Sequence, residues 1–274
     1  MRQPPQTAAT RPRHNAAMLK RLMQLLFATS AADAVVGEAQ WQAAEARLSF
    51  LAHLSATERQ RLRRLALDFI RSKSWQGAQG LVVTLEMQLE IALQACLLIL
   101  NRPPGEYDGW VEIIIYPGDF VIPRQEMDEH GIVHEYDDAV LGEAWDGGPL
   151  LLSWQQVEYG DAFDDDGINV VIHEFAHKLD MATGEADGVP SLPDAAARRR
   201  WIAAFEPAYL DFCARVDHGE EAAQNSAIDP YAATAPAEFF AVLSEVFFEQ
   251  PAVLRSEYPA VYAELSAFYG QTPR

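Results

Sequence analysis

The feature that most restricts this chain is the segment VVIHEFAHKLD, residues 170–180, in which two histidines stand four positions apart. On a helix, residues four apart differ by about 40° in azimuth and about 6 Å in height. His173 and His177 can therefore direct two imidazole nitrogens at one point. Zinc accepts such ligands at about 2.0–2.1 Å. Glu174 is turned by about 100° from His173, where it can reach a water molecule beside the ion.

This HExxH pattern is typical of metallopeptidases, but a helix that merely carries two histidines is the alternative. A catalytic zinc keeps three protein ligands and one open position. The chain continues as GEADGVP, so the HExxHxxGxxH pattern with a third histidine does not follow. The third ligand is therefore expected to be a carboxylate on a later helix. Glu238 and Glu245 are the two candidates, because seven residues put them on one helix face, although both could point to solvent.

Two stretches of this sequence resemble one family. VVIHEFAHKLD and IDPYAATAPAEFFAVLSEVFFEQP, residues 228–251, look like the bacterial Mlc titration factor A family of zinc-dependent peptidases. The similarity extends more loosely from about Trp41 to Phe268 and includes IIIYPGDFV and GPLLLSW. Residues 231–240 also resemble the zinc-binding helix of anthrax lethal factor, in the glutamate and in the tyrosine seven residues before it.

The resemblance implies a zincin-like domain of gluzincin type with one Zn²⁺ per chain. It implies that Glu238 is the third ligand, beside His173 and His177. Glu174 would be the catalytic base, and Tyr231 the phenol that steadies the tetrahedral oxyanion. Elementary chemistry agrees, because a phenolic O–H stabilises charge that develops on a carbonyl oxygen. The alternative for Tyr231 is an ordinary loop tyrosine that packs on the core.

Three further residues receive supporting roles from the same resemblance. Asp180 and Glu245 would accept hydrogen bonds that hold ligand rings or the neighbouring helix in place. His134, in GIVHEY, resembles a family histidine that can approach the zinc, and it is the candidate fourth ligand. There it would keep the enzyme latent by displacing water; a half-exposed histidine at a strand end is the alternative. The remaining histidines have no ligand spacing and carry no prediction: His14, His53, His130 and His218.

The expected fold is α+β, a small mixed sheet with the HExxH helix, preceded by a mostly helical region. Residues 1–37 are predicted to be a disordered or loosely attached tail. Residues 38–270 are predicted to form one domain, helical over 38–100, strand-containing over 108–160 and helical again over 161–270. Ser55 followed by Glu58 is a capping box that starts a helix. The strand candidates are 110–123, 131–136 and 148–157, and the acidic run 161–166 is expected to cap the motif helix.

Composition limits the partners. The formal net charge is −19 and the pI about 4.6, so most of the surface would repel a phosphate backbone, and no direct nucleic-acid ligand is expected. The apolar segment 81–100 contains two glutamates and two glutamines, which predicts a core helix and no membrane span. Cys96 and Cys213 lie in apolar helical patterns, which favours two buried thiols in a reducing, cytoplasmic setting.

Together these observations predict a zinc metallopeptidase of aminopeptidase-like type that hydrolyses peptides, with the strand in GPLLLSWQQV as the edge on which an extended peptide lies. By the resemblance, the protein would also bind and sequester Mlc, a DNA-binding repressor of glucose-uptake genes. The alternative is a regulatory binding protein whose metal site is latent or structural. A closed site with His134 as fourth ligand would favour that alternative.

Overall fold

The computed structural model describes residues 36–127, 133–160, 168–218 and 228–274, and only the backbone for residues 123–140, 159 and 160. The predicted tail therefore lies almost wholly outside the described residues, and the acidic run 161–166 lies outside them too. Val36–Arg274 form one compact unit. The α-helices are α2 (Glu38–Ala46), α3 (Ala56–Ser72), α4 (Leu85–Leu98), α5 (Trp154–Gly160), α6 (Val170–Asp180), α7 (Ala195–Asp217), α9 (Pro236–Glu249), α10 (Pro251–Glu257) and α11 (Pro259–Tyr269). Short 3-10 helices are η2 (Ser49–His53), η3 (Met181–Thr183) and η4 (Pro230–Ala233).

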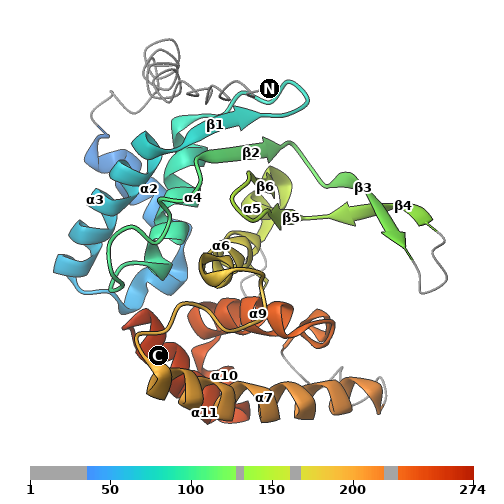
Figure 1. The fold of residues 1–274 in the computed structure, drawn as a ribbon. Helices are drawn as coiled ribbons and strands as arrows, with labels where there is room; N and C mark the ends of the chain where they lie inside the picture. Colours follow the sequence, from blue (N-terminus) through green and yellow to red (C-terminus); the bar gives the residue numbers. More distant parts are fainter. Residues whose placement is uncertain (1–35, 128–132, 161–167, 219–227) are drawn as a thin grey trace, which may run out of the picture. The chain divides into compact units, whose positions relative to one another are not determined.

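This unit contains a small mixed sheet, as expected from the sequence (Figure 1), but one of its strands, Ser74–Gly77, lies within residues 38–100, which were predicted to be helical. Its four strands follow the order β1-β2-β6-β5, in which β1, β2 and β6 are parallel and β5 runs antiparallel to β6. The strands are β1 (Ser74–Gly77), β2 (Glu112–Tyr116), β5 (Gly142–Ala144) and β6 (Leu150–Ser153). A separate antiparallel hairpin, β3 (Phe120–Met127) with β4 (Val133–Val140), projects from the sheet.

Helix ends follow local sequence signals. Ser55 accepts a hydrogen bond from the backbone N–H of Glu58, and the Glu58 carboxylate accepts one from the N–H of Ser55, which makes the predicted capping box. Such a cap contributes about 0.5–2 kcal/mol to stability. Thr84 and Asp194 cap α4 and α7 in the same way through their side-chain oxygens. Pro236 opens α9 at its first turn, where a missing N–H costs nothing.

Two helices carry the hydrophobic core. Every side chain of α4 from Met87 to Leu98 is buried, so the predicted core helix is confirmed. No helix among the described residues is long and apolar enough to cross a bilayer. α9 is buried along nearly its whole length, and its Phe239 and Phe240 stack edge-on against Phe205 and Trp201 of α7. α6 lies between these two helices and is therefore held from both sides (Figure 1).

The interpretation of GPLLLSWQQV as an edge strand was wrong. The strand ends at Ser153, and α5 begins at Trp154. β6 lies between β2 and β5, and Leu150–Ser153 are all buried, as a central strand covered on both faces should be. The edge on this side is β5, only three residues long and beginning with glycine, and so too short to show a periodic pattern.

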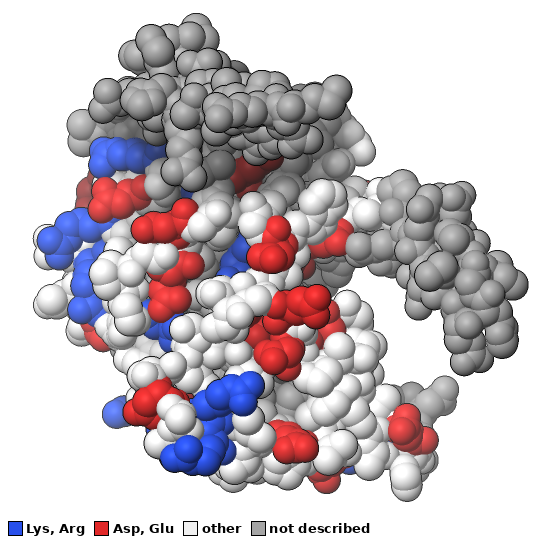
Figure 2. Space-filling model, in the orientation of Figure 1, with Lys and Arg blue, Asp and Glu red and all other residues white. Residues whose placement is uncertain are grey.

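The acidic excess is visible on the surface. Figure 2 shows Asp and Glu side chains spread over one face, while Lys and Arg gather over α3 and near the start of α7. Some of the basic groups on α3 are already neutralised: Arg63 forms ion pairs with Glu38 and Glu45 at 2.8 and 2.6 Å. Exposed acidic groups therefore dominate the field around the molecule.

Candidate metal centre

Helix α6 carries the two histidines and is buried on almost every side. Asn169 caps it by accepting a hydrogen bond from the N–H of Ile172 at 2.9 Å. The Asn169 side chain also donates to Gln94 of α4 and Glu249 of α9, at 2.8 and 2.7 Å. Three helices are thus tied together at the first turn of α6, directly before His173.

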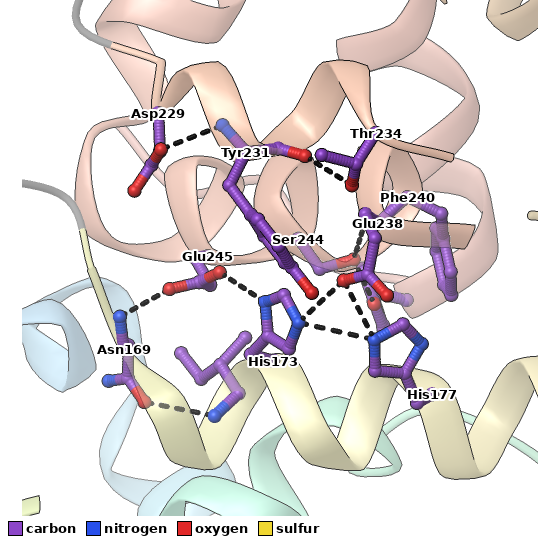
Figure 3. Close-up of polar contacts among 12 residues, drawn as sticks. Asn169, His173, His177, Asp229, Tyr231, Thr234, Glu238, Phe240, Ser244 and Glu245 are labelled. Carbon is purple, nitrogen blue, oxygen red and sulfur yellow. Dashed lines mark hydrogen bonds and ion pairs between the residues drawn. The ribbon is translucent and has the colours of Figure 1, made fainter. Parts of the chain in front are cut away.

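Three side chains converge across the contact between α6 and α9 (Figure 3). His173 Nε2 lies 3.0 Å from Glu238 Oε2, His177 Nε2 lies 3.2 Å from the same oxygen, and the two Nε2 atoms are 3.1 Å apart. These are the residues of the described chain that could together hold a metal ion. The two histidines come from α6 and the carboxylate from α9.

The spacing of the three atoms fits a small cation. Ligands about 2.0–2.1 Å from zinc at tetrahedral angles lie about 3.3–3.4 Å from one another. His173 Nδ1 faces Glu245 Oε1 at 2.7 Å, so a proton on Nδ1 would be donated to that carboxylate. Neutral His173 then turns the lone pair of Nε2 towards Glu238 Oε2 and His177 Nε2. A proton on one of the two Nε2 atoms, or a cation between the three atoms, would satisfy the lone pairs that meet here.

The carboxylates around His173 determine its protonation. Burial disfavours the imidazolium, but hydrogen bonds to Glu238 and Glu245 outweigh burial and raise the pKa of His173 well above its ordinary value. Burial would also raise the pKa of Glu238, yet its contacts with His173 and His177 lower that pKa to about 2. Burial raises the pKa of Glu245 in spite of its contact with His173. Glu238 is thus an anion that faces two imidazoles.

Glu245 is firmly held beside His173. It lies two turns after Glu238 on α9, on the same face, and is almost fully buried. One oxygen faces His173 Nδ1, and the other accepts a short hydrogen bond from the backbone N–H of Asn169. The structure thus brings both candidate carboxylates to His173 and separates their positions: Glu238 faces Nε2 and Glu245 faces Nδ1 (Figure 3).

Glu174 lies on the neighbouring face of α6 and is 5% exposed. Burial raises its pKa to about 8, although the nearby His173 acts in the opposite direction. Its Oε2 has no hydrogen-bond partner among the described residues. A buried carboxylate with an unused oxygen is costly for stability, and such sites are candidates for chemistry.

Tyr231 approaches the same site from η4. Its N–H is held by the Asp229 side chain at 2.8 Å, which fixes the turn before α9. The phenol ring centroid lies 6.2 Å from that of His173, and the side chain points towards His173 and Glu238 (Figure 3). Tyr231 is 52% exposed, so it is not a core tyrosine.

The structure describes the side chain of Asp180 but only the backbone of His134. Asp180 is fully buried at the end of α6, and its Oδ2 accepts a hydrogen bond from the N–H of Gly188 at 2.8 Å. Burial raises its pKa to about 6. Among the described residues, Asp180 Oδ1 and His177 Nδ1 are both buried without a hydrogen-bond partner. His134 stands opposite Glu126 in the β3–β4 hairpin, and its side chain lies outside the described part, so the fourth-ligand prediction stays a prediction.

Sequence reasoning missed three residues that support this site. Gly142 of β5 lies against Glu174, where an added Cβ would be 2.6 Å from the carboxylate. Lys178 of α6 donates to the carbonyls of Trp145 and Gly148 in the β5–β6 turn. Asn169 could have been recognised as a helix cap, because it immediately precedes the apolar run. Gly142 and Lys178 carry no local signal, since their partners are distant in the sequence.

Comparison with known proteins agrees with this geometry. Residues 23–270 match the family described as glucose-regulated metallo-peptidase M90. The chain belongs to this metallopeptidase family. The match begins inside the segment that was predicted to be a tail. The protein named Mlc titration factor A from Serratia proteamaculans is 43% identical over 86% of this chain and 88% of its own length. The proteins of the same name from Pectobacterium atrosepticum and Klebsiella pneumoniae (strain 342) are 41% and 40% identical, over 85% and 86% of this chain and 86% and 87% of their own lengths.

Proposed function

We propose that this member of the M90 family is a zinc-dependent peptidase of gluzincin type, with His173, His177 and Glu238 as the ligands of one zinc ion. The observation that supports this most is the convergence of two imidazole nitrogens and one carboxylate oxygen within 3.0–3.2 Å of one another. Imidazole and carboxylate together with an open position are the usual donor set of a catalytic zinc. A bound zinc ion would act as a Lewis acid and lower the pKa of a water molecule on it towards about 7.

Glu174 is proposed as the general base. It would accept the proton of the attacking water and pass it to the leaving amine. Two features support this role: its position beside His173 on α6, and a buried oxygen without a hydrogen-bond partner among the described residues. The buried surroundings make Glu174 a stronger base than an exposed glutamate, because burial raises its pKa.

Tyr231 is proposed to donate a hydrogen bond from its hydroxyl to the oxyanion that forms from the scissile carbonyl. Its exposed ring and its orientation towards His173 and Glu238 support this role (Figure 3). Glu245 and Asp180 are proposed to orient the histidines, Glu245 through His173 Nδ1 and Asp180 from the end of α6.

The substrate is proposed to be a peptide that adds to the outer edge of β5. Among the described strands β5 pairs with β6 alone, so its other edge can hydrogen-bond to an extended chain. The strand itself lies against Glu174, since Gly142 contacts that side chain with one face of β5. The aminopeptidase-like preference comes from the family resemblance and stays part of the proposal. So does a cytoplasmic location, for which two unpaired cysteines, Cys96 buried and Cys213 half-buried, give support.

Metal content tests the proposal directly. Purified wild type should carry one zinc per chain by mass spectrometry, and Glu238→Ala should lose it or bind it far more weakly. Glu264→Ala is the matched control, because Glu264 pairs with Arg200 on a distant surface. If wild type holds no metal and takes up none when zinc is supplied, the peptidase proposal is wrong. The convergent side chains would then be a protonated hydrogen-bond cluster.

A second function is proposed from the relatives, whose name, Mlc titration factor A, refers to Mlc. We propose that the chain also binds a DNA-binding repressor of this kind. The strongly acidic surface supports this, because it complements a basic DNA-binding face. Glu174→Gln separates the two functions: hydrolysis should stop, while zinc and binding of purified Mlc measured by calorimetry should remain. Absence of binding by both wild type and variant would exclude the second function.

A further inference from the structure

α6 has two working faces. His173 and His177 are four residues apart and turn towards α9. Glu174 and Lys178 are also four residues apart, and they turn towards β5 and the turn that follows it. The two faces differ by about 100° around the helix. A contact that fixes β5 on the face of Glu174 and Lys178 therefore also fixes the position of β5 relative to His173 and His177.

The first contact on this second face is between Gly142 and Glu174. A Cβ added at Gly142 would lie 2.6 Å from Cγ and from Oε1 of Glu174, and 2.8 Å from its Cδ. Real Cβ atoms do not approach other atoms so closely. The backbone of β5 thus rests directly against the carboxylate, and any side chain at position 142 would push Glu174 away or lift the strand.

The second contact is made by Lys178. Its ammonium donates to the carbonyl of Trp145 at 2.6 Å and to that of Gly148 at 2.9 Å, which are the two ends of the β5–β6 turn. Lys178 is 4% exposed, and it lies over the Trp110 ring with Nζ 4.7 Å from the ring centroid. A buried ammonium that binds two carbonyls holds them strongly, because hydrogen bonds to charged groups exceed those between neutral groups.

We propose that Gly142 and Lys178 form a two-point clamp that fixes edge strand β5 on α6. Lys178 is then a positioning residue for the strand that receives the peptide, and Gly142 is a positioning residue for Glu174. This inference rests on the peptidase function proposed above. The clamp makes the strand and the base one rigid unit, so a peptide paired with β5 presents its scissile bond at a fixed distance from Glu174.

Lys178→Met tests the first half, and Lys73→Met is a matched control. Lys73 is also buried, also lies over Trp110, with Nζ 3.8 Å from the ring centroid, and also donates to two carbonyls, those of Tyr107 and Trp110. Both variants should lose similar thermal stability. Only Lys178→Met should raise KM for a peptide substrate, by about 10-fold, because only it releases β5. Its kcat and zinc content should change little.

Gly142→Ala tests the second half. Here kcat should fall, by up to about 100-fold, since Glu174 is displaced by an ångström or so, while KM and zinc content stay near wild type. Gly109→Ala is the control: nothing lies within 4 Å of a Cβ at Gly109, and neither glycine has a positive φ. Lys178→Met should therefore change mainly KM, and Gly142→Ala mainly kcat. A simple loss of stability would not separate the two constants in this way.

Equal effects of Lys178→Met and Lys73→Met on KM, or of Gly142→Ala and Gly109→Ala on kcat, would overturn the clamp. If Gly142→Ala does not fold, the lysine pair decides alone. If wild type hydrolyses no peptide, the peptidase proposal fails, and hydrogen exchange then tests the clamp by itself. The amides of Glu143 and Trp145, which point towards β6, should exchange at least about 10-fold faster in Lys178→Met than in Lys73→Met, and equal rates would refute it.

Discussion

The protein buries charged side chains in two neighbouring regions and satisfies them in different ways. Around Trp110, the ammonium groups of Lys73 and Lys178 each donate to two backbone carbonyls and lie over the indole ring. Between α6 and α9, by contrast, one carboxylate oxygen, Glu238 Oε2, meets two imidazole nitrogens, and Glu174 Oε2 has no hydrogen-bond partner among the described residues.

The difference shows how to distinguish a structural buried charge from a functional one. The hydrogen bonds of the two lysines need no further partner, because each ammonium donates only to carbonyl oxygens, which accept. The cluster of His173, His177 and Glu238 instead brings together three groups that can all ligate a metal ion, and beside it Glu174 Oε2 has no hydrogen-bond partner among the described residues. Natural proteins rarely keep buried polar atoms unsatisfied unless the site has another task.

Removing the charge of Glu174 should have the largest effect on activity. Glu174→Gln keeps the shape of the side chain but cannot accept the proton of the attacking water. We expect kcat for a peptide substrate to fall by about 10²–10⁴-fold, the usual contribution of a general base. Zinc content by mass spectrometry should be unchanged. Activity within threefold of wild type would mean that another residue is the base.

Removing the phenol of Tyr231 should have the next largest effect. Tyr231→Phe deletes the hydroxyl that would donate to the oxyanion and leaves the exposed ring in place. We expect kcat to fall by about 10²–10³-fold with little change in KM, because the hydrogen bond forms only as charge develops. Tyr209→Phe is the control, since Tyr209 donates to the carbonyl of Ala233 behind the same turn. Similar losses in both variants would mean that η4 is merely disturbed.

Replacing Glu245 should weaken the metal site without destroying it. Glu245→Gln removes the charge that faces His173 Nδ1 and places an amide beside the N–H of Asn169 or beside His173. We expect zinc affinity, measured by competition with a chelator, to fall by about 10–100-fold. Glu257→Gln is the control, because it breaks an ion pair with Arg215 away from the site. Equal affinities of both variants would mean that Glu245 only supports the packing of α9.

Part of the fold and part of the candidate site could be predicted from the sequence. The helix starts at Ser55, Thr84, Asp194 and Pro236 were predictable because capping depends on neighbours along the chain. The spacing of the histidines likewise predicted their common face. The order of the strands was not predictable. β6 is central because it pairs with β2, which is distant in the sequence, and with β5, which is only three residues long. Lys178 and Gly142 stayed hidden for the same reason.

The smallest predicted effect concerns the lysine region and its dependence on pH. Burial lowers the pKa of Lys73 from 10.5 to about 8. Between pH 8 and 10.5 the unfolded chain therefore binds more protons than the folded one, so this lysine makes stability rise with pH. Above about pH 10 the buried Tyr107 and Tyr269 act in the opposite direction, because burial raises their pKa and the unfolded chain loses those protons first.

The clearest window is thus pH 7.5–9.5, where Lys73 should add about 1–2 kcal/mol to the change in unfolding free energy. Urea unfolding of metal-free wild type and Lys73→Met across this window gives the difference, in which the titrations common to both proteins cancel. The unfolding free energy of wild type should rise relative to that of the variant as the pH rises. A constant difference would mean that Lys73 keeps its ordinary pKa, and that its carbonyls and the Trp110 ring satisfy the ammonium as well as water does. The lysine region would then be more completely satisfied than its burial suggests, and the contrast with the histidine cluster would be sharper.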